Sequence, residues 1–84
     1  MIINLIKSNG KATVRIVNGY RNTNLTLQGI ADGSTVYVVP TDENGEGSVE
    51  MYPGNYYAFF PGAMTDNYKI VRIFSGYNVL DMSK

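Results

Sequence analysis

The chain contains no cysteine, no histidine and no tryptophan. Without thiolate or imidazole groups it cannot build a Cys/His zinc site, an iron–sulfur cluster or a histidine-ligated haem. The same lack excludes catalysis by a cysteine nucleophile or by a serine that depends on a histidine base. We therefore expect a protein that works without a cofactor of these kinds.

An excess of charge of either sign is also missing, because seven Lys and Arg residues balance seven Asp and Glu residues. A chain with no basic surplus is poorly suited to a phosphate backbone, so we expect no nucleic-acid partner. Long apolar runs are absent too, since the run that starts at Met1 is broken by Asn4 and closed by Lys7. It is too short for a signal core or a membrane span. We interpret residues 1–7 as a strand, expect no membrane association, and expect a complete small gene product that starts at Met1.

Apolar and polar residues alternate with period two along the whole chain, and glycine and proline separate the alternating runs. No window of eleven residues holds a helical apolar stripe that is free of both. The pattern predicts strands at residues 1–7, 12–18, 24–28, 34–39, 48–52, 55–60, 68–74 and, as a short last one, 78–82. Seven or eight short strands at nearly regular spacing are typical of a sandwich. We therefore predict an all-β fold in which residues 1–84 form one small antiparallel β-sandwich.

The most informative stretch runs from Thr41 to Tyr56 and reads TDENGEGSVEMYPGNY. An aspartate at its start is suited to accept backbone N–H groups in an Asx-turn, and the Asn-Gly pair after it is suited to reverse the chain. The Pro-Gly pair carries the signal of a type II turn, which would reverse the chain again and direct the ring of Tyr56 inward. The segment thus predicts a hairpin with structural turns at Asp42, Asn44, Gly45, Pro53 and Gly54.

This segment resembles the hairpin of carboxypeptidase regulatory-like domains, which have transthyretin-like or immunoglobulin-like sandwich folds. The residues that match are Thr41, Asp42, Gly45, Pro53, Gly54 and Tyr56. The chain departs from the family at Gly47, where an aromatic residue is usual, and a glycine there suggests a bulge or the close approach of another chain. The resemblance implies an Ig-like or transthyretin-like module that is not catalytic and that stabilises, presents or docks something larger.

Acidic residues are scattered along the sequence, and we expect none of them to form a catalytic or metal site. A glycosidase needs two carboxylates that converge in a cleft, which a sandwich of this size rarely has. Asp42, Asn44 and Glu46 alternate as in a calcium loop, but the twelfth position of such a loop would be Pro53. We therefore predict that the protein is not an enzyme and holds no metal.

Aromatic residues crowd the segment around the Pro-Gly pair: Tyr52, Tyr56, Tyr57, Phe59 and Phe60. Successive strand residues face opposite sides, so either Tyr56 and Phe60 fill the core while Tyr57 and Phe59 face outward, or the reverse holds. Either arrangement exposes aromatic surface, and tyrosine is enriched at interfaces. We predict an interface at these five residues, supported by strand-edge pairing along residues 47–52.

Taken together, these features predict a non-enzymatic structural protein that docks on a larger assembly. In size and fold class it resembles the small accessory proteins of tailed-phage heads, such as decoration proteins and head-fibre bases. The expected partner is a capsid or other virion subunit, with a possible homo-oligomer, and the expected location is the virion assembled in the host cytoplasm. The alternative is an extracellular adhesion or carbohydrate-binding module of a larger secreted protein, in which exposed tyrosines stack on sugars.

Overall fold

The computed structural model describes residues 11–62 and 68–84, and the predicted strand at residues 1–7 lies outside them. The described chain is all-β and forms seven strands: β1 Ala12–Val17, β2 Asn24–Gly29, β3 Val36–Pro40, β4 Gly47–Met51, β5 Gly54–Phe59, β6 Lys69–Ile73 and β7 Gly76–Asp81. Each overlaps one of the strands predicted from alternation, which confirms the fold class. None of the described residues belongs to a helix that is long and apolar enough to cross a membrane.

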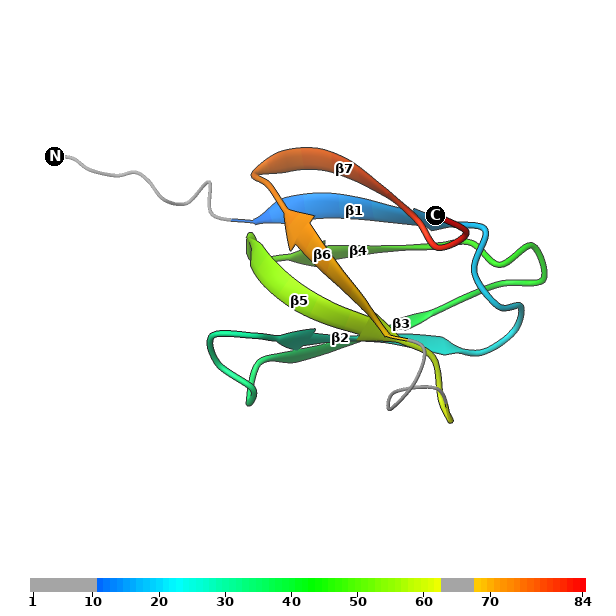
Figure 1. Cartoon of the computed structure of the whole chain (residues 1–84). Helices are drawn as coiled ribbons and strands as arrows, with labels where there is room; N and C mark the ends of the chain where they lie inside the picture. The colour runs from blue at the N-terminus through cyan, green and yellow to red at the C-terminus, as the bar shows by residue number, and fades with distance from the viewer. Residues whose placement is uncertain (1–10, 63–67) are drawn as a thin grey trace, which may run out of the picture.

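The strands form two sheets that face each other, as Figure 1 shows, with the orders β4-β1-β7 and β3-β2-β5-β6. Four of the five strand pairings among the described residues are antiparallel. The fifth is parallel, between β1 and β7, with a register that runs from Ala12 opposite Gly76 to Val17 opposite Asp81. The prediction of an antiparallel sandwich therefore holds for four of these pairs and was wrong at the fifth. Parallel neighbours need a long connection, and these two strands are separated by the rest of the domain.

The core lies between the two sheets and is built from the inward half of each alternating strand. The burial pattern of β1 alternates strictly over its first five residues, and that of β2 does so over Leu25, Leu27 and Gly29. The fully or nearly fully buried apolar side chains are Ala12, Val14, Ile16, Leu25, Leu27, Val39, Met51, Tyr56, Ala58, Phe60 and Ile73. Burial of these side chains is the main force that holds the two sheets together.

The segment predicted as a hairpin instead crosses twice between the sheets. β3 belongs to the four-stranded sheet, β4 to the three-stranded sheet and β5 to the four-stranded sheet again, so β4 and β5 do not pair. Gly54 has φ 153°, whereas the glycine of a type II turn has φ near +80°. The hairpin and its type II turn were therefore wrong. The chain here passes from one sheet to the other, so Pro53 does not lie between two strands that pair with each other. Gly54 already belongs to β5 and pairs with Ile73 of β6.

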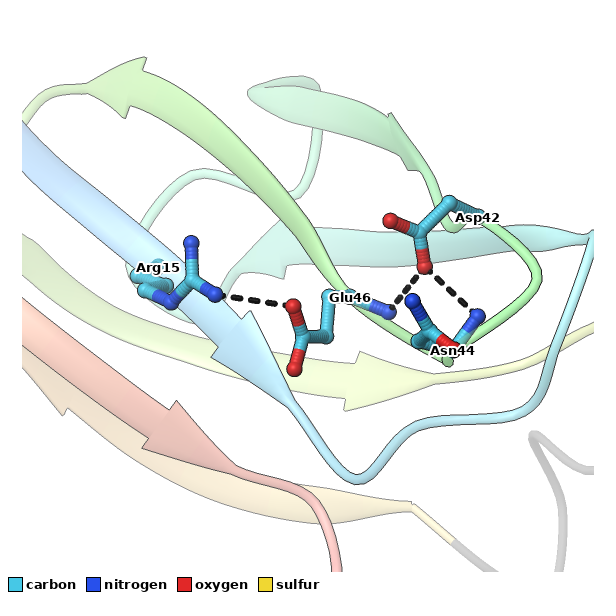
Figure 2. A network of polar contacts seen from close by, with 4 residues as sticks. All are labelled: Arg15, Asp42, Asn44 and Glu46. Carbon is cyan, nitrogen blue, oxygen red and sulfur yellow. Dashed lines mark hydrogen bonds and ion pairs between the residues drawn. The ribbon is translucent and has the colours of Figure 1, made fainter.

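The first half of that segment forms the predicted Asx-turn. One carboxylate oxygen of Asp42 accepts hydrogen bonds from the backbone N–H groups of Asn44 at 2.8 Å and Glu46 at 3.0 Å (Figure 2). These two donors hold the pKa of the Asp42 carboxyl below its usual value, because they stabilise its charged form. Arg15 on β1 forms an ion pair with Glu46 at 2.8 Å, an exposed contact that adds little stability.

Two glycines in this turn allow close backbone contact within the chain. Gly45 has φ +75°, and its carbonyl accepts a hydrogen bond of 2.9 Å from the N–H of Gly19. A Cβ at Gly47 would lie 2.4 Å from the carbonyl oxygen of Pro40. The sequence predicted close approach or a bulge at Gly47, and the approach is real. The partner in this contact, however, is the chain's own strand β3 rather than another chain.

Thr41 is a buried polar residue that links the end of β3 to the connection between β1 and β2. Its hydroxyl donates to the carbonyl of Tyr20 at 2.6 Å and accepts from the N–H of Thr23 at 3.1 Å. We expect Thr41→Val, which keeps the side-chain shape, to lower the free energy of unfolding by about 1–3 kcal/mol, because both backbone groups lose a partner. Thr41→Ser keeps the hydroxyl and is the matched control. Denaturant unfolding of both variants measures the difference, and equal stability of Thr41→Val and wild type would show that the hydroxyl adds nothing.

Candidate docking surface

The outward side of the four-stranded sheet carries apolar side chains from three of its strands and from Tyr68, which immediately precedes β6. Strand register sets them in rows: Val36, Gln28, Tyr57 and Ile70 lie across the sheet in one row. Thr26 lies between Val38 and Phe59 in the next. We call this surface the outer sheet face and define it by Thr26, Gln28, Val36, Val38, Tyr57, Phe59, Tyr68 and Ile70.

The apolar side chains at both margins of the outer sheet face are well exposed. Ile70 is 65% exposed and Val38 57% exposed, while Tyr57 and Phe59 in the middle are half-buried. Among the described strand residues that point outward from this sheet, the one charged side chain is Arg72, and its guanidinium lies 5.2 Å from the ring centre of Phe74. The face is therefore apolar at its edges and nearly free of charge.

A hollow of about 270 Å3 opens on this face between Gln28, Tyr57, Phe59 and Tyr68. The rings of Tyr57 and Tyr68 meet nearly at right angles, with their centres 5.4 Å apart. The side-chain amide N–H of Gln28 donates to the carbonyl of Gly33 at 3.0 Å, which orients the amide beside the hollow. The hollow thus offers aromatic walls and a held amide group.

The structure divides the five predicted interface residues among three places. Tyr56 and Phe60 lie in the core, so their prediction as contact residues was wrong, while Tyr57 and Phe59 lie on the outer sheet face. Tyr52 is exposed where the chain leaves β4, with the ammonium group of Lys11 5.5 Å from its ring centre. Of the two arrangements that alternation allowed, the structure has the one with Tyr56 inside. Its hydroxyl donates to the carbonyl of Tyr52 at 2.6 Å, so the phenol is satisfied in the core.

Four apolar residues of the outer sheet face were not identified from the sequence: Val36, Val38, Tyr68 and Ile70. A signal exists for two of them, Val36 and Val38: β3 lacks alternation, since these two residues point outward while Val39 is buried. A strand that is apolar on both sides indicates a sheet covered on both sides. Placing these residues beside Tyr57 requires the strand order, which the sequence did not provide.

The outward side of the three-stranded sheet is different in character. Thr13, Arg15, Ser48 and Glu50 point outward from β1 and β4. Tyr77 and Val79 on the edge strand β7 are exposed but lie beside Thr13 and Arg15. Within residues 11–62 and 68–84, no three acidic side chains gather as a metal ion would require. The outer sheet face is therefore the stronger candidate for binding.

Comparison with known proteins supports the fold. No protein-family model matches the sequence, and no curated protein matches it. The crystal structure of a DUF3823 family protein from Parabacteroides merdae is similar, with a TM-score of 0.60 at 15% sequence identity. The similarity covers 86% of this chain and 43% of that one, so this chain spans less than half of the length of its structural neighbour. At this identity the similarity shows a shared β-sandwich-like fold.

Proposed function

We propose that this protein is a non-enzymatic docking module that binds a protein partner through its outer sheet face. The main support for the proposal is that six large apolar side chains lie together on one surface of the sheet. Among the described strand residues that point outward from this sheet, Arg72 alone is charged. Exposed apolar surface of this extent, rimmed by polar residues, marks interaction sites. Tyrosine, which has an apolar ring and a polar tip, is favoured in such contacts.

The extent of the face is sufficient for useful binding. The exposed fractions of these side chains leave on the order of 500 Å2 of apolar surface. Covering it would contribute roughly 12 kcal/mol before the costs of association, at about 25 cal/mol per Å2. The remaining binding energy after those costs would suit a partner that is present at high local concentration, as in a repeated assembly.

The assembly that we propose is a phage virion, in which the partner is a capsid or other virion subunit. Small size, zero net charge and the lack of cysteine and histidine suit a protein whose role is to bind and stabilise. The proposal rests on the analogy, in size and fold class, with the small accessory proteins of phage heads. It assigns the contact with the virion to the outer sheet face.

The test replaces the two central aromatic side chains of the face. We expect Tyr57→Ser with Phe59→Ser to reduce co-purification with virus particles at least tenfold, while the melting temperature falls by only a few degrees, because both side chains are half-buried on the outward side. The matched control is Tyr77→Ser with Val79→Ser on the other sheet, which should leave co-purification unchanged. Retained particle binding together with a collapsed melting temperature would contradict the proposal.

A second candidate is an extracellular adhesion or carbohydrate-binding module. The hollow lined by Gln28, Tyr57, Phe59 and Tyr68 favours it, because perpendicular rings and an oriented amide suit the apolar face and hydroxyl groups of a sugar. The greater length of the similar DUF3823 protein is compatible with such a fold as one part of a longer chain. Binding of neutral glycans on an array, lost in Tyr57→Ser, would favour this candidate over protein docking.

A further inference from the structure

We propose that the partner which covers the outer sheet face is a second copy of this chain, so that two four-stranded sheets pack face to face about a two-fold axis. The inference rests on the proposed function, because it assumes that this face is a protein-docking surface, and it names another copy of the chain, in place of a capsid subunit, as the protein that covers the face. In such an isologous contact each copy contributes the same surface and each contact occurs twice.

Charge is the first argument for a second copy. The two central rows of the face, Val36-Gln28-Tyr57-Ile70 and Val38-Thr26-Phe59, contain no charged side chain. The chain as a whole has a formal net charge of zero, so two copies approach without net repulsion. Arg72 lies toward one end of the face, over the ring of Phe74, where it can remain in solvent. A partner recognised by charge would need charged groups that this face lacks, whereas a neutral apolar surface is complementary to itself.

Area is the second argument. Two copies together bring about 1,000 Å2 of apolar surface to the contact, twice the amount on one copy. The polar groups of Thr26, Gln28 and Asn55 on the same side add to this, which brings the total to the lower end of the 1,200–2,000 Å2 that is typical of specific interfaces. A micromolar dimer is the expected result.

Shape is the third argument. The most exposed apolar side chains, Ile70 and Val38, stand at opposite margins of the sheet, on its edge strands β6 and β3. The middle strand β5 presents the half-buried Tyr57 and Phe59 beside the hollow. Two sheets that pack with their strands nearly aligned lie about 10 Å apart, with interdigitating side chains. In a two-fold contact of this kind the edge strands of one copy lie over the edge strands of the other, so that Val38 on β3 can meet Ile70 on β6, and the symmetry makes this contact occur twice.

The experiment compares two substitutions that add the same charge on two edge strands. Ile70→Arg places the charge on the outer sheet face, and Tyr77→Arg places it at a residue of similar exposure on β7. Sedimentation velocity of the purified full chain from about 5 μM to 1 mM should show a monomer–dimer equilibrium for wild type and Tyr77→Arg. Ile70→Arg should weaken the dimer roughly 100-fold, because two unpaired guanidinium groups would enter an apolar contact. Circular dichroism shows whether each variant is folded.

Two results would overturn the inference: a wild-type chain that stays monomeric over the whole range, or a folded Ile70→Arg that dimerises as strongly as Tyr77→Arg. A monomeric wild type whose particle binding is lost in the Tyr57→Ser, Phe59→Ser variant would refute the second copy and leave the docking function intact. A dimer that is lost in Ile70→Arg, with no particle binding by wild type, would support the second copy and refute docking on a virion. Binding of a neutral glycan by a wild-type chain that stays monomeric would refute the second copy and assign the face to sugar binding.

Discussion

Gly45→Ala should lower the free energy of unfolding by about 2–5 kcal/mol, which is a large part of the stability of a domain of this size. Two costs add at this position. The backbone has φ +75°, which disfavours any residue with a Cβ. The new Cβ would also lie 2.2 Å from the carbonyl oxygen of Gly19, so the backbone must move and strain the hydrogen bond from Gly19 to Gly45. Denaturant unfolding followed by circular dichroism measures the loss.

Gly62→Ala separates the two costs, because Gly62 has a similar φ of +82° and a Cβ added there would meet no atom of the described residues within 4 Å. We expect Gly62→Ala to cost about 1–2 kcal/mol, from the backbone conformation alone. A Gly45→Ala variant that is no less stable than Gly62→Ala would show that the backbone contact between Gly19 and Gly45 adjusts at little cost. That contact would then contribute little to the stability of the domain.

Leu27→Ala is the second change with a large expected effect, a loss of about 2–5 kcal/mol. Leu27 is fully buried in the central part of the four-stranded sheet, where its strand neighbours are Tyr37 on β3 and Ala58 on β5. The substitution removes apolar contacts and leaves a cavity that the small Ala58 cannot fill. In so small a domain the variant should be partly unfolded at 37 °C, which thermal unfolding would detect.

Val79→Ala provides the comparison for Leu27→Ala, because it also shortens an aliphatic strand residue but at a side chain that is 58% exposed. It should change the free energy of unfolding by less than about 0.5–1 kcal/mol. Similar losses in the two variants would contradict the assignment of Leu27 to the core. They would also argue against the two-sheet arrangement, since that arrangement is what buries Leu27.

Local sequence features predicted local structure well. Asp42 accepts backbone hydrogen bonds from Asn44 and Glu46, as the Asx-turn required. The strand order could not be predicted in the same way, because Pro53 and Gly54 are compatible with both a tight hairpin and an arch between sheets. The chain forms a hairpin if β4 pairs with β5 and crosses between the sheets if β4 pairs with β1. The packing of all seven strands determines which pairing forms.

The same division holds for the candidate site. Because successive strand residues point to opposite sides, the sequence placed Tyr56 and Tyr57 on opposite sides of one strand. In the structure Tyr56 points into the core, where its hydroxyl has a hydrogen-bond partner. The neighbours of Tyr57 on the outer sheet face come from residues that are distant in sequence, such as Val36 and Ile70. The sequence therefore indicated aromatic surface on this strand, although it placed the candidate docking surface too narrowly.

The sequence by itself determined that the chain is all-β, where most of its strands lie and that Cys/His chemistry is excluded, because these depend on composition and on the period-two alternation of neighbouring residues. Only the tertiary structure decided the parallel pairing of β1 with β7, the crossings between sheets and the set of side chains on the outer sheet face. The physical reason is that strand pairing joins segments far apart in the chain. Backbone hydrogen bonds look alike for every strand, so the packing of the whole core selects the order.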